Sequence, residues 1–392
     1  MQYRRFGRTG IPMPIFSCGG VRFIYDEFKE YPQELIPQDN QKNAEATIHR
    51  SLEVGINHLE TARIYGTSEM QLGAILSELS RQELIIQTKV MPQSDPQQFR
   101  HLFEQSLAYL GLDYVDLLTI HGINNEQQLN DSICFQGCLD VIKQLQREGK
   151  VRFRGFSTHG PTNLIIKTIE TDQFDYVNLH WYYINQFNWS AIETANYYDL
   201  GVFIISPCDK GGMLYKPPQK LVDLCYPLSP MLFNDLFCLS HPQIHTLSLG
   251  AAQPSDFDEH LKVIGLLEQA DEILTPILNR LQTEAISSLG KDWVNSWYVG
   301  LPSYQETPGK INIPIILWLR NLAVAYDMLE YAQKRYNHLK TKDPWFPGNT
   351  AEELSKFDLE PYLKNSPHQD TIHKVLEEAH QLLNIPNEKT SS

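Results

Sequence analysis

The amino-acid sequence predicts a parallel (β/α)8 TIM barrel followed by an all-helical C-terminal extension. Eight short apolar runs, each of strand length, recur between residues 14 and 249, and helical patterns separate most of them. Eight such strand and helix units in about 250 residues fit a closed barrel better than an open doubly wound sheet. No GxGxxG motif follows the first run, which counts against a Rossmann domain.

The first half of the chain predicts a hairpin and then four barrel strands. The hairpin is expected over residues 1–13, with its turn at Arg8-Thr9-Gly10. Apolar runs predict strands over residues 14–18, 56–59, 84–88 and 115–120. Helices are expected over 42–54, from Thr67 onward and from Asp95 onward. Asp95-Pro96 joins a good N-cap to a proline at the first helical position, so a helix should begin at Pro96.

The second half completes the barrel and then changes character. Four more strands are expected, over residues 151–156, 176–180, 202–206 and 246–249. Helical patterns lie at 162–170, 190–199 and 255–268. Strand-like runs then stop, and amphipathic patterns over 266–289, 315–339 and 367–383 predict helices. We therefore expect two domains, a barrel over residues 1–262 and a helical domain over 263–392.

Composition narrows the class of protein. The 392 residues carry a formal charge of −14, which argues against a nucleic-acid partner, because binding to phosphates needs a cationic face. No apolar stretch approaches the roughly 18 to 20 residues that span a bilayer, so no membrane association is expected. The N-terminal residues lack the apolar core of a signal peptide, and a cytoplasmic location is expected.

The six cysteines form no CxxC pair. Cys134 and Cys138 stand four residues apart in a stretch with helical character, but a metal site would need further ligands nearby. We expect the cysteines to be structural, since a free cysteine behaves as a small buried hydrophobe. No metal ligands are predicted.

Four polar residues stand where predicted strands end. Glu60 ends the second strand and Tyr65 follows it, while Lys89 and His121 come directly after the next two strands. Parallel strands bring their carboxyl ends to one rim, so these side chains should converge. An unpaired lysine is costly to bury, which favours a functional role for Lys89.

The same residues carry a resemblance to a known family. Gly7-Arg8-Thr9-Gly10, the stretch from His58 to Glu69, and then Lys89 and His121 resemble the aldo-keto reductases. The resemblance covers residues 1 to about 262. It implies a (β/α)8 barrel that binds a nicotinamide cofactor without a Rossmann domain and reduces an aldehyde or ketone, a small-molecule carbonyl substrate, to an alcohol.

The resemblance implies a role for each catalytic residue. Tyr65 would donate a proton to the carbonyl oxygen as negative charge develops there. The Lys89 ammonium would lower the pKa of that phenol, and Glu60 would hold Lys89 in place. His121 would orient the substrate oxygen. The family usually has aspartate at the position of Glu60, so the carboxylate here is one methylene longer.

The resemblance also implies a cofactor site. The nicotinamide carboxamide is expected at Ser157, Thr158 and Asn178, and Trp181 falls where the family has a tyrosine stacked on the nicotinamide ring. The pyrophosphate is expected along the loop of Ser206, Pro207, Cys208 and Lys210. The adenosine end is expected at Gly250, Ala251, Gln253, Glu259 and His260.

The nucleotide preference stays open between NADP and NAD. The resemblance favours NADP, whose 2′-phosphate meets basic residues in the family. Ala252 and Asp256 fall near those basic positions here. A carboxylate repels a phosphate and accepts hydrogen bonds from a ribose hydroxyl pair, which favours relaxed or NAD preference.

The extension resembles a particular group of relatives. The stretch from Gly300 to Pro314 is similar to the C-terminal region of aldo-keto reductases fused to a ferredoxin-like cluster domain. This sequence has no cysteine after Cys238, so no iron–sulfur cluster is expected there from its own thiolates. An alternative function also stays open: a nicotinamide-binding redox sensor or partner adaptor with little turnover, suggested by the departures at Glu60, Thr158 and Asn178.

Overall fold

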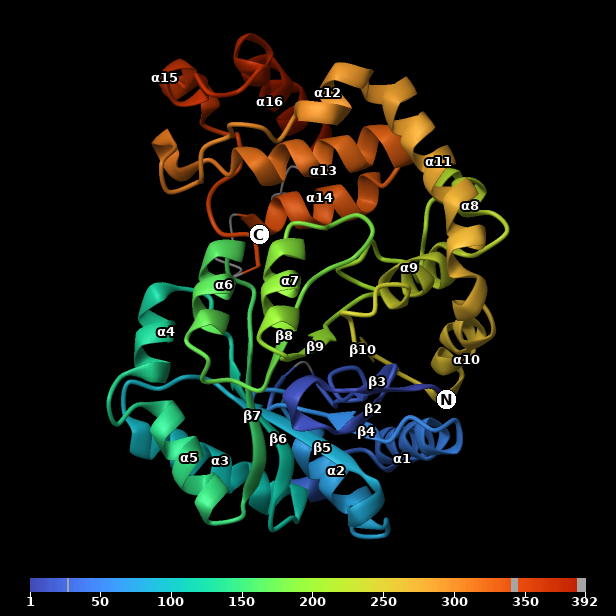
Figure 1. The fold of residues 1–392 in the computed structure, drawn as a ribbon, viewed down its shortest axis with the longest axis vertical. Helices are drawn as coiled ribbons and strands as arrows, with labels where there is room; N and C mark the ends of the chain where they lie inside the picture. The colour runs from blue at the N-terminus through green and yellow to red at the C-terminus, as the bar shows by residue number, and fades with distance from the viewer. Residues whose placement is uncertain (27, 340–344, 386–392) are drawn as a thin grey trace, which may run out of the picture. The chain divides into compact units, whose positions relative to one another are not determined.

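A closed barrel of eight parallel strands forms the centre of the fold in the computed structural model, which describes residues 1–26, 28–339 and 345–385. The strands pair in the order β10-β3-β4-β5-β6-β7-β8-β9, and helices α1 to α7 lie around them (Figure 1). This confirms the predicted (β/α)8 class. The barrel strands are β3 (Phe16–Gly19), β4 (His58–Glu60), β5 (Ile85–Val90), β6 (Val115–His121), β7 (Val151–Ser157), β8 (Tyr176–Leu179), β9 (Gly201–Ile204) and β10 (Thr246–Leu249).

A hairpin closes the amino-terminal end of the barrel. Strands β1 (Tyr3–Arg5) and β2 (Pro12–Pro14) pair antiparallel, as the sequence predicts. Phe6 is fully buried and packs in one core cluster with side chains of β5, β6, β8 and β9. A side chain at Gly201, at the start of β9, would come within 2.5 Å of the Phe6 ring, so glycine is required there. The end opposite the strand carboxyl termini is therefore filled by protein.

Helices connect the strands as the right-handed crossovers of a parallel barrel require. Asp95 caps α3 by accepting a hydrogen bond from the Gln97 amide at 2.9 Å, which confirms that helix start. The helices that follow the barrel strands are α1 (Gln38–Glu53), α2 (Ser68–Leu76), α3 (Pro96–Leu110), α4 (Glu126–Ile133), α5 (Cys138–Arg147), α6 (Thr162–Glu170), α7 (Trp189–Tyr197), α8 (Gln219–Cys225), α9 (Pro230–Leu239) and α10 (Phe257–Leu261).

Three predicted helices differ from the observed ones. The stretch around Cys134 and Cys138 is split, because α4 ends at Ile133 and α5 begins at Cys138, and Cys134 is exposed. The pattern over 315–339 forms two helices that break at Asp327, a residue in the left-handed conformation with φ 59°. Residues 255–268 form α10 and short 3-10 turns in place of one long helix.

The described residues form two compact units. The first unit comprises Met1–Gly211 and Asn234–Ala270 and contains the barrel. The second comprises Gly212–Phe233 and the chain from Asp271 onward. Residues 212–233 therefore group with the helical unit, although the sequence division at residue 262 assigns them to the barrel domain. The sequence of this connection, which follows the seventh barrel strand, contains no pattern that predicts its grouping with the helical unit.

The second unit is helical and has its own core. Trp318 and Trp345 are buried in it, and Trp318 packs edge-on against Phe346 at 5.4 Å between ring centroids. Its helices are α11 (Ala270–Leu289), α12 (Lys291–Ser296), α13 (Ile313–Tyr326), α14 (Leu329–His338), α15 (Glu360–Leu363) and α16 (Gln369–Leu383). Residues 340–344 and 386–392 of the predicted helical domain lie outside the described residues. Among the described helices, none has the length and apolar character needed to cross a membrane.

Candidate active site

The four predicted catalytic residues meet at the carboxyl ends of three adjacent strands. Glu60 is the last residue of β4, Lys89 lies near the end of β5, and His121 ends β6. The register pairs Glu60 with Gln87 and Lys89 with Thr119, so the strand ends lie side by side. Tyr65 lies in the loop between β4 and α2. The sequence-predicted convergence is therefore present in the structure.

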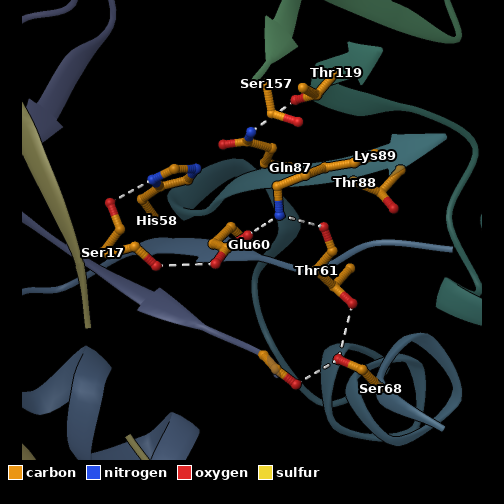
Figure 2. A network of polar contacts seen from close by, with 12 residues as sticks. Ser17, His58, Glu60, Thr61, Ser68, Gln87, Thr88, Lys89, Thr119 and Ser157 are labelled. Carbon is orange, nitrogen blue, oxygen red and sulfur yellow. Dashed lines mark hydrogen bonds and ion pairs between the residues drawn. The ribbon is translucent and has the colours of Figure 1, made fainter. Parts of the chain in front are cut away.

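Glu60 and Lys89 form a buried ion pair. Lys89 is 2% exposed and Glu60 is 5% exposed. The Lys89 ammonium bonds the Glu60 carboxylate and also donates to the Thr61 carbonyl at 3.0 Å (Figure 2). The second carboxylate oxygen of Glu60 accepts from the Ser248 hydroxyl at 3.0 Å. Both ends of the pair are thus held by several bonds at once.

The longer carboxylate of Glu60 has space because a neighbouring residue lacks a side chain. A Cβ atom at Gly19 would come within 2.8 Å of the carboxylate oxygen and 2.9 Å of the Ser248 hydroxyl. Both approaches are closer than real Cβ contacts allow. Gly19 therefore leaves the room that the added methylene of Glu60 needs.

The loop that carries Tyr65 is tied to the barrel at both ends. The Arg63 amide donates to the Lys89 carbonyl at 2.9 Å. At the start of α2, the Ser68 hydroxyl bonds the Thr61 hydroxyl at 2.8 Å and donates to the Gly20 carbonyl at 2.9 Å (Figure 2). These bonds fix the backbone that positions Tyr65.

Tyr65 and His121 form the accessible side of the cluster. Both are half-buried, whereas Lys89 behind them is buried. The Lys89 nitrogen lies 4.9 Å from the centroid of the Tyr65 ring. The Tyr65 and His121 rings stand edge to face, with centroids 5.8 Å apart. A small molecule reaching this rim would meet the phenol and the imidazole first.

The electrostatics of the cluster differ in one respect from the sequence expectation. Burial disfavours the Lys89 ammonium, but Glu60 and Tyr65 outweigh it and raise the pKa of Lys89. Burial raises the pKa of Tyr65, and the Lys89 ammonium only partly offsets this, so the net direction is upward. The expected lowering of the phenol pKa is therefore wrong, because desolvation exceeds the attraction of the ammonium. Burial and the Lys89 charge lower the pKa of His121 to about 3, so its imidazole is neutral.

Two polar residues continue the rim beyond His121. The register places His121 opposite Ser157 on β7, and Ser157 opposite Asn178 on β8. Asn178 is fully buried, yet neither its amide nitrogen nor its amide oxygen has a hydrogen-bond partner in the described part of the chain. Buried amides are nearly always paired, so this side chain fits a ligand that carries an amide of its own.

Thr158 and Trp181 are engaged within the protein. The Thr158 hydroxyl donates to the Ile123 carbonyl at 2.7 Å and accepts from the Gly160 amide at 2.9 Å. Trp181 is 1% exposed and stacks on Phe237, with centroids 5.0 Å apart and planes at 15°. This packing favours a structural role for Trp181 over the expected stacking on a nicotinamide ring.

The loop after β9 is a tight turn. The Lys210 amide donates to the Ser206 carbonyl at 3.1 Å, and Ser206 has φ 53°. A Cβ atom at Gly211 would lie 1.9 Å from the Pro207 carbonyl oxygen, so glycine is required there. Burial lowers the pKa of His159, and the charge of Lys210 lowers it further. His159 lies two residues after Ser157, which ends β7. This loop therefore brings a cation close to the Ser157 rim.

The residues expected at the adenosine end differ in their exposure and in their contacts. Gly250 and Gln253 are exposed, whereas Ala251 is buried, and Glu259 pairs with Lys262 at 2.5 Å. His260 is 4% exposed and forms an ion pair with Asp235, so it faces the protein interior.

Comparison with known proteins agrees with this geometry. A family model described as the aldo/keto reductase family matches residues 36–165, which include all four predicted catalytic residues. This part of the barrel is similar to the aldo-keto reductase family. A holo-form aldo-keto reductase from Bacillus halodurans has the same fold, with a TM-score of 0.60 and 18% identity over 71% of this chain and 96% of that one.

Two curated relatives are also similar to this chain. A putative voltage-gated potassium channel subunit beta from Schizosaccharomyces pombe is 25% identical over 345 residues, 70% of this chain and 94% of the relative. An L-glyceraldehyde 3-phosphate reductase from Escherichia coli is 25% identical over 177 residues, 41% of this chain. The matched region spans 46% of that reductase, just under half of its length.

The folded chain places two further residues beside the candidate site that the sequence does not reveal. Arg22 lies against Gly250, where a Cβ atom would come within 3.0 Å of the Arg22 side chain. Phe28 packs edge-on against Tyr65, with centroids 6.3 Å apart. Both belong to the long loop after β3, which has no regular pattern, so only the folded chain reveals them. Asp256, expected near the 2′-phosphate, accepts a hydrogen bond from the Ala252 amide at 2.8 Å.

Proposed function

We propose that the barrel reduces an aldehyde or ketone to an alcohol, with NADPH or NADH as the source of hydride and Tyr65 as the proton donor. The observation that carries this proposal is that half-buried Tyr65 packs against both His121 and Lys89, and that Lys89 is held in a buried ion pair with Glu60. When bound, the nicotinamide nucleotide supplies the hydride.

The residues at the rim fit such a nucleotide. The unpartnered amide of Asn178 can bond both polar atoms of a carboxamide, and the Ser157 hydroxyl lies beside it in register. Lys210 and Arg22 would supply cations for the phosphate groups. Arg22 beside Gly250 favours NADP, because a guanidinium bonds a phosphate in a fork.

Residues of the chain itself would then donate the proton to the substrate oxygen and stabilise the charge that results. The raised pKa of Tyr65 keeps the phenol protonated at neutral pH, so a proton is available for donation. As Tyr65 gives up its proton, the Lys89 ammonium stabilises the phenolate that forms, because it is charged and fixed by Glu60. Neutral His121 retains one ring N–H, which can donate to the substrate oxygen and orient it.

The decisive experiment compares wild type with Tyr65→Phe on a panel of aromatic and short aldehydes, following loss of the nicotinamide absorbance. General acid catalysis contributes roughly 100- to 10,000-fold, so turnover should fall by that factor while the nucleotide Kd is unchanged. Tyr197→Phe is the matched control, because Tyr197 is 83% exposed and lies on α7 away from the site. Full turnover in Tyr65→Phe would refute the assignment.

A second candidate function is a nicotinamide-binding sensor or partner adaptor. The observation that favours it is the similarity to a relative named as a potassium channel subunit beta, which the match covers almost completely. The internal hydrogen bonds of Thr158 also leave fewer groups for a cofactor. Tight nucleotide binding by wild type, with no turnover across the panel, would favour this function over reduction.

A further inference from the structure

Three side chains from separate segments meet beside the loop that follows β9. Cys208 lies in that loop, Asp235 in α9 and His260 in α10. The His260 Nδ1 atom is paired with the Asp235 carboxylate. On the other side of the ring, His260 Nε2 lies 3.6 Å from the Cys208 sulfur. The order is a thiol, an imidazole and a carboxylate in contact.

The arrangement is held rigidly. Asp235 is 1% exposed and His260 is 4% exposed, and the Phe16 ring packs edge-on against His260 at 5.8 Å. Next to Asp235, the Asn234 amide donates to the Pro207 carbonyl at 3.4 Å, which fixes the residue before Cys208. The imidazole therefore has little freedom to leave the thiol.

Cys208 differs from the other five cysteines of the chain. Burial raises the pKa of Cys18 to about 12, of Cys225 to about 12 and of Cys138 to about 11, and raises that of Cys238 further. Those four thiols are buried. Cys134 is exposed but follows α4, away from this imidazole. Cys208 combines partial exposure with a histidine at contact distance.

The charges around the imidazole favour its protonated form. Burial alone would lower the pKa of His260, but the Asp235 carboxylate, with the neighbouring Cys208 sulfur, outweighs it and holds the pKa well above its usual value. Glu259 adds a negative charge that acts on Asp235, and Asp235 in turn adds to the raised pKa of buried Cys238. A nucleophile next to a base that a third group orients is the arrangement of activated thiols.

We propose that Cys208 is a modification site whose sulfur, in contact with His260 Nε2, hydrogen peroxide oxidises to a sulfenic acid. The sulfur attacks one peroxide oxygen, the S–O bond forms and the O–O bond breaks. Sulfur is oxidised by two electrons and the peroxide is reduced. The proton that leaves the thiol passes through His260 to the departing hydroxide, which is released as water.

The modification has a consequence for the nucleotide, and this step rests on the proposed function. Cys208 lies in the tight loop expected to run along the pyrophosphate, between Pro207 and Lys210. An added oxygen on sulfur would crowd that loop, which has no spare room at Gly211. Oxidation of Cys208 should therefore weaken nucleotide binding.

The test measures sulfenic-acid labelling by dimedone after brief exposure to peroxide, with each cysteine peptide quantified by mass spectrometry. Cys134 is the internal control in the same folded molecule. We expect Cys208 to be labelled about tenfold faster than Cys134 at neutral pH, although Cys134 is more exposed. Equal or slower labelling of Cys208 would overturn the proposal.

A variant separates activation from packing. Asp235→Asn keeps the shape and removes the charge that holds His260, so the ratio of Cys208 to Cys134 labelling should fall to near one. A general loosening of the fold would raise labelling of buried Cys138 and Cys225 as well. A ratio unchanged in Asp235→Asn, with those two still unlabelled, would refute the role of the ion pair.

Nucleotide binding is measured separately, with NADPH as the probe before and after peroxide. We expect Kd to rise several-fold in wild type and to stay constant in Cys208→Ser. If Cys208 is oxidised quickly while Kd is unchanged, the link to the nucleotide is overturned. If untreated protein binds no nucleotide, the proposed function fails, and the labelling ratio still decides the modification site.

Discussion

Removing the charge of Glu60 is the most informative perturbation of the site. In Glu60→Gln the Lys89 ammonium stays buried at 2% exposure and keeps the Thr61 carbonyl but loses its counterion. Breaking a buried pair in this way costs about 3 to 5 kcal/mol. The retained bond to Thr61 argues for the lower end, about 3 kcal/mol, or roughly a 100-fold rise in the population of opened molecules.

The sign of the pH dependence distinguishes this cause from simple loss of packing. In wild type the raised pKa of Lys89 means that its contribution is full below the unfolded pKa and is lost only as pH rises through the folded pKa. In Glu60→Gln burial is no longer opposed by the carboxylate, so the pKa of Lys89 should drop below its unfolded value. Stability of the variant should then increase as pH rises from about 7 to about 9, where wild type is level.

The assay is amide hydrogen exchange of peptides covering β4 and β5, because it reports the barrel separately from the helical unit. Glu60→Asp is the matched control, since it keeps the charge and shortens the side chain. Exchange in Glu60→Gln equal to wild type near pH 7 would refute the reasoning, as would a variant that becomes less stable toward pH 9.

Three further predictions follow from the rim. Asn178→Ala should raise the nucleotide Kd about tenfold with little loss of stability, measured by titration and thermal unfolding, because the amide has no partner in the described protein. A matching loss of stability would contradict this. Gly211→Ala should destabilise the loop and weaken nucleotide binding, because the new methyl group meets the Pro207 carbonyl, and unaltered binding would be the opposing result. The kcat/KM for reduction should be level between about pH 6 and about pH 9, since the pKa of His121 lies near 3 and that of Tyr65 above its ordinary value. A limb near pH 7 that disappears in His121→Gln would disprove the neutral imidazole.

The sequence predicts the barrel because its strands are buried on both faces. All six residues of β5 are buried, and its apolar residues Ile85, Ile86 and Val90 mark the run as a buried strand. Glu60, Lys89 and His121 could be found for the same reason, because a charged residue at the end of such a run needs a partner. The capped start of α3 rests on two adjacent residues and needs no knowledge of the fold.

Features that depend on contacts distant in sequence could not be predicted. Asp235 and His260 are 25 residues apart and lie in elements with no shared pattern, so His260 was assigned to the cofactor. The upward shift of the Tyr65 pKa depends on how completely the folded chain excludes water. The break at Asp327 follows from a single left-handed residue within an otherwise continuous helical pattern.

The filled amino-terminal end of the barrel leaves the rim at the strand carboxyl ends as the side on which ligands would bind. Phe6 and the hairpin seal one side, so hydride donor, carbonyl compound and product would all pass through the rim of Tyr65 and His121. When both ligands reach the site past the same rim, their order of binding is fixed. The ligand that binds deeper must bind first and dissociate last. We therefore expect steady-state kinetics in which the deeper ligand's release limits the turnover of fast substrates.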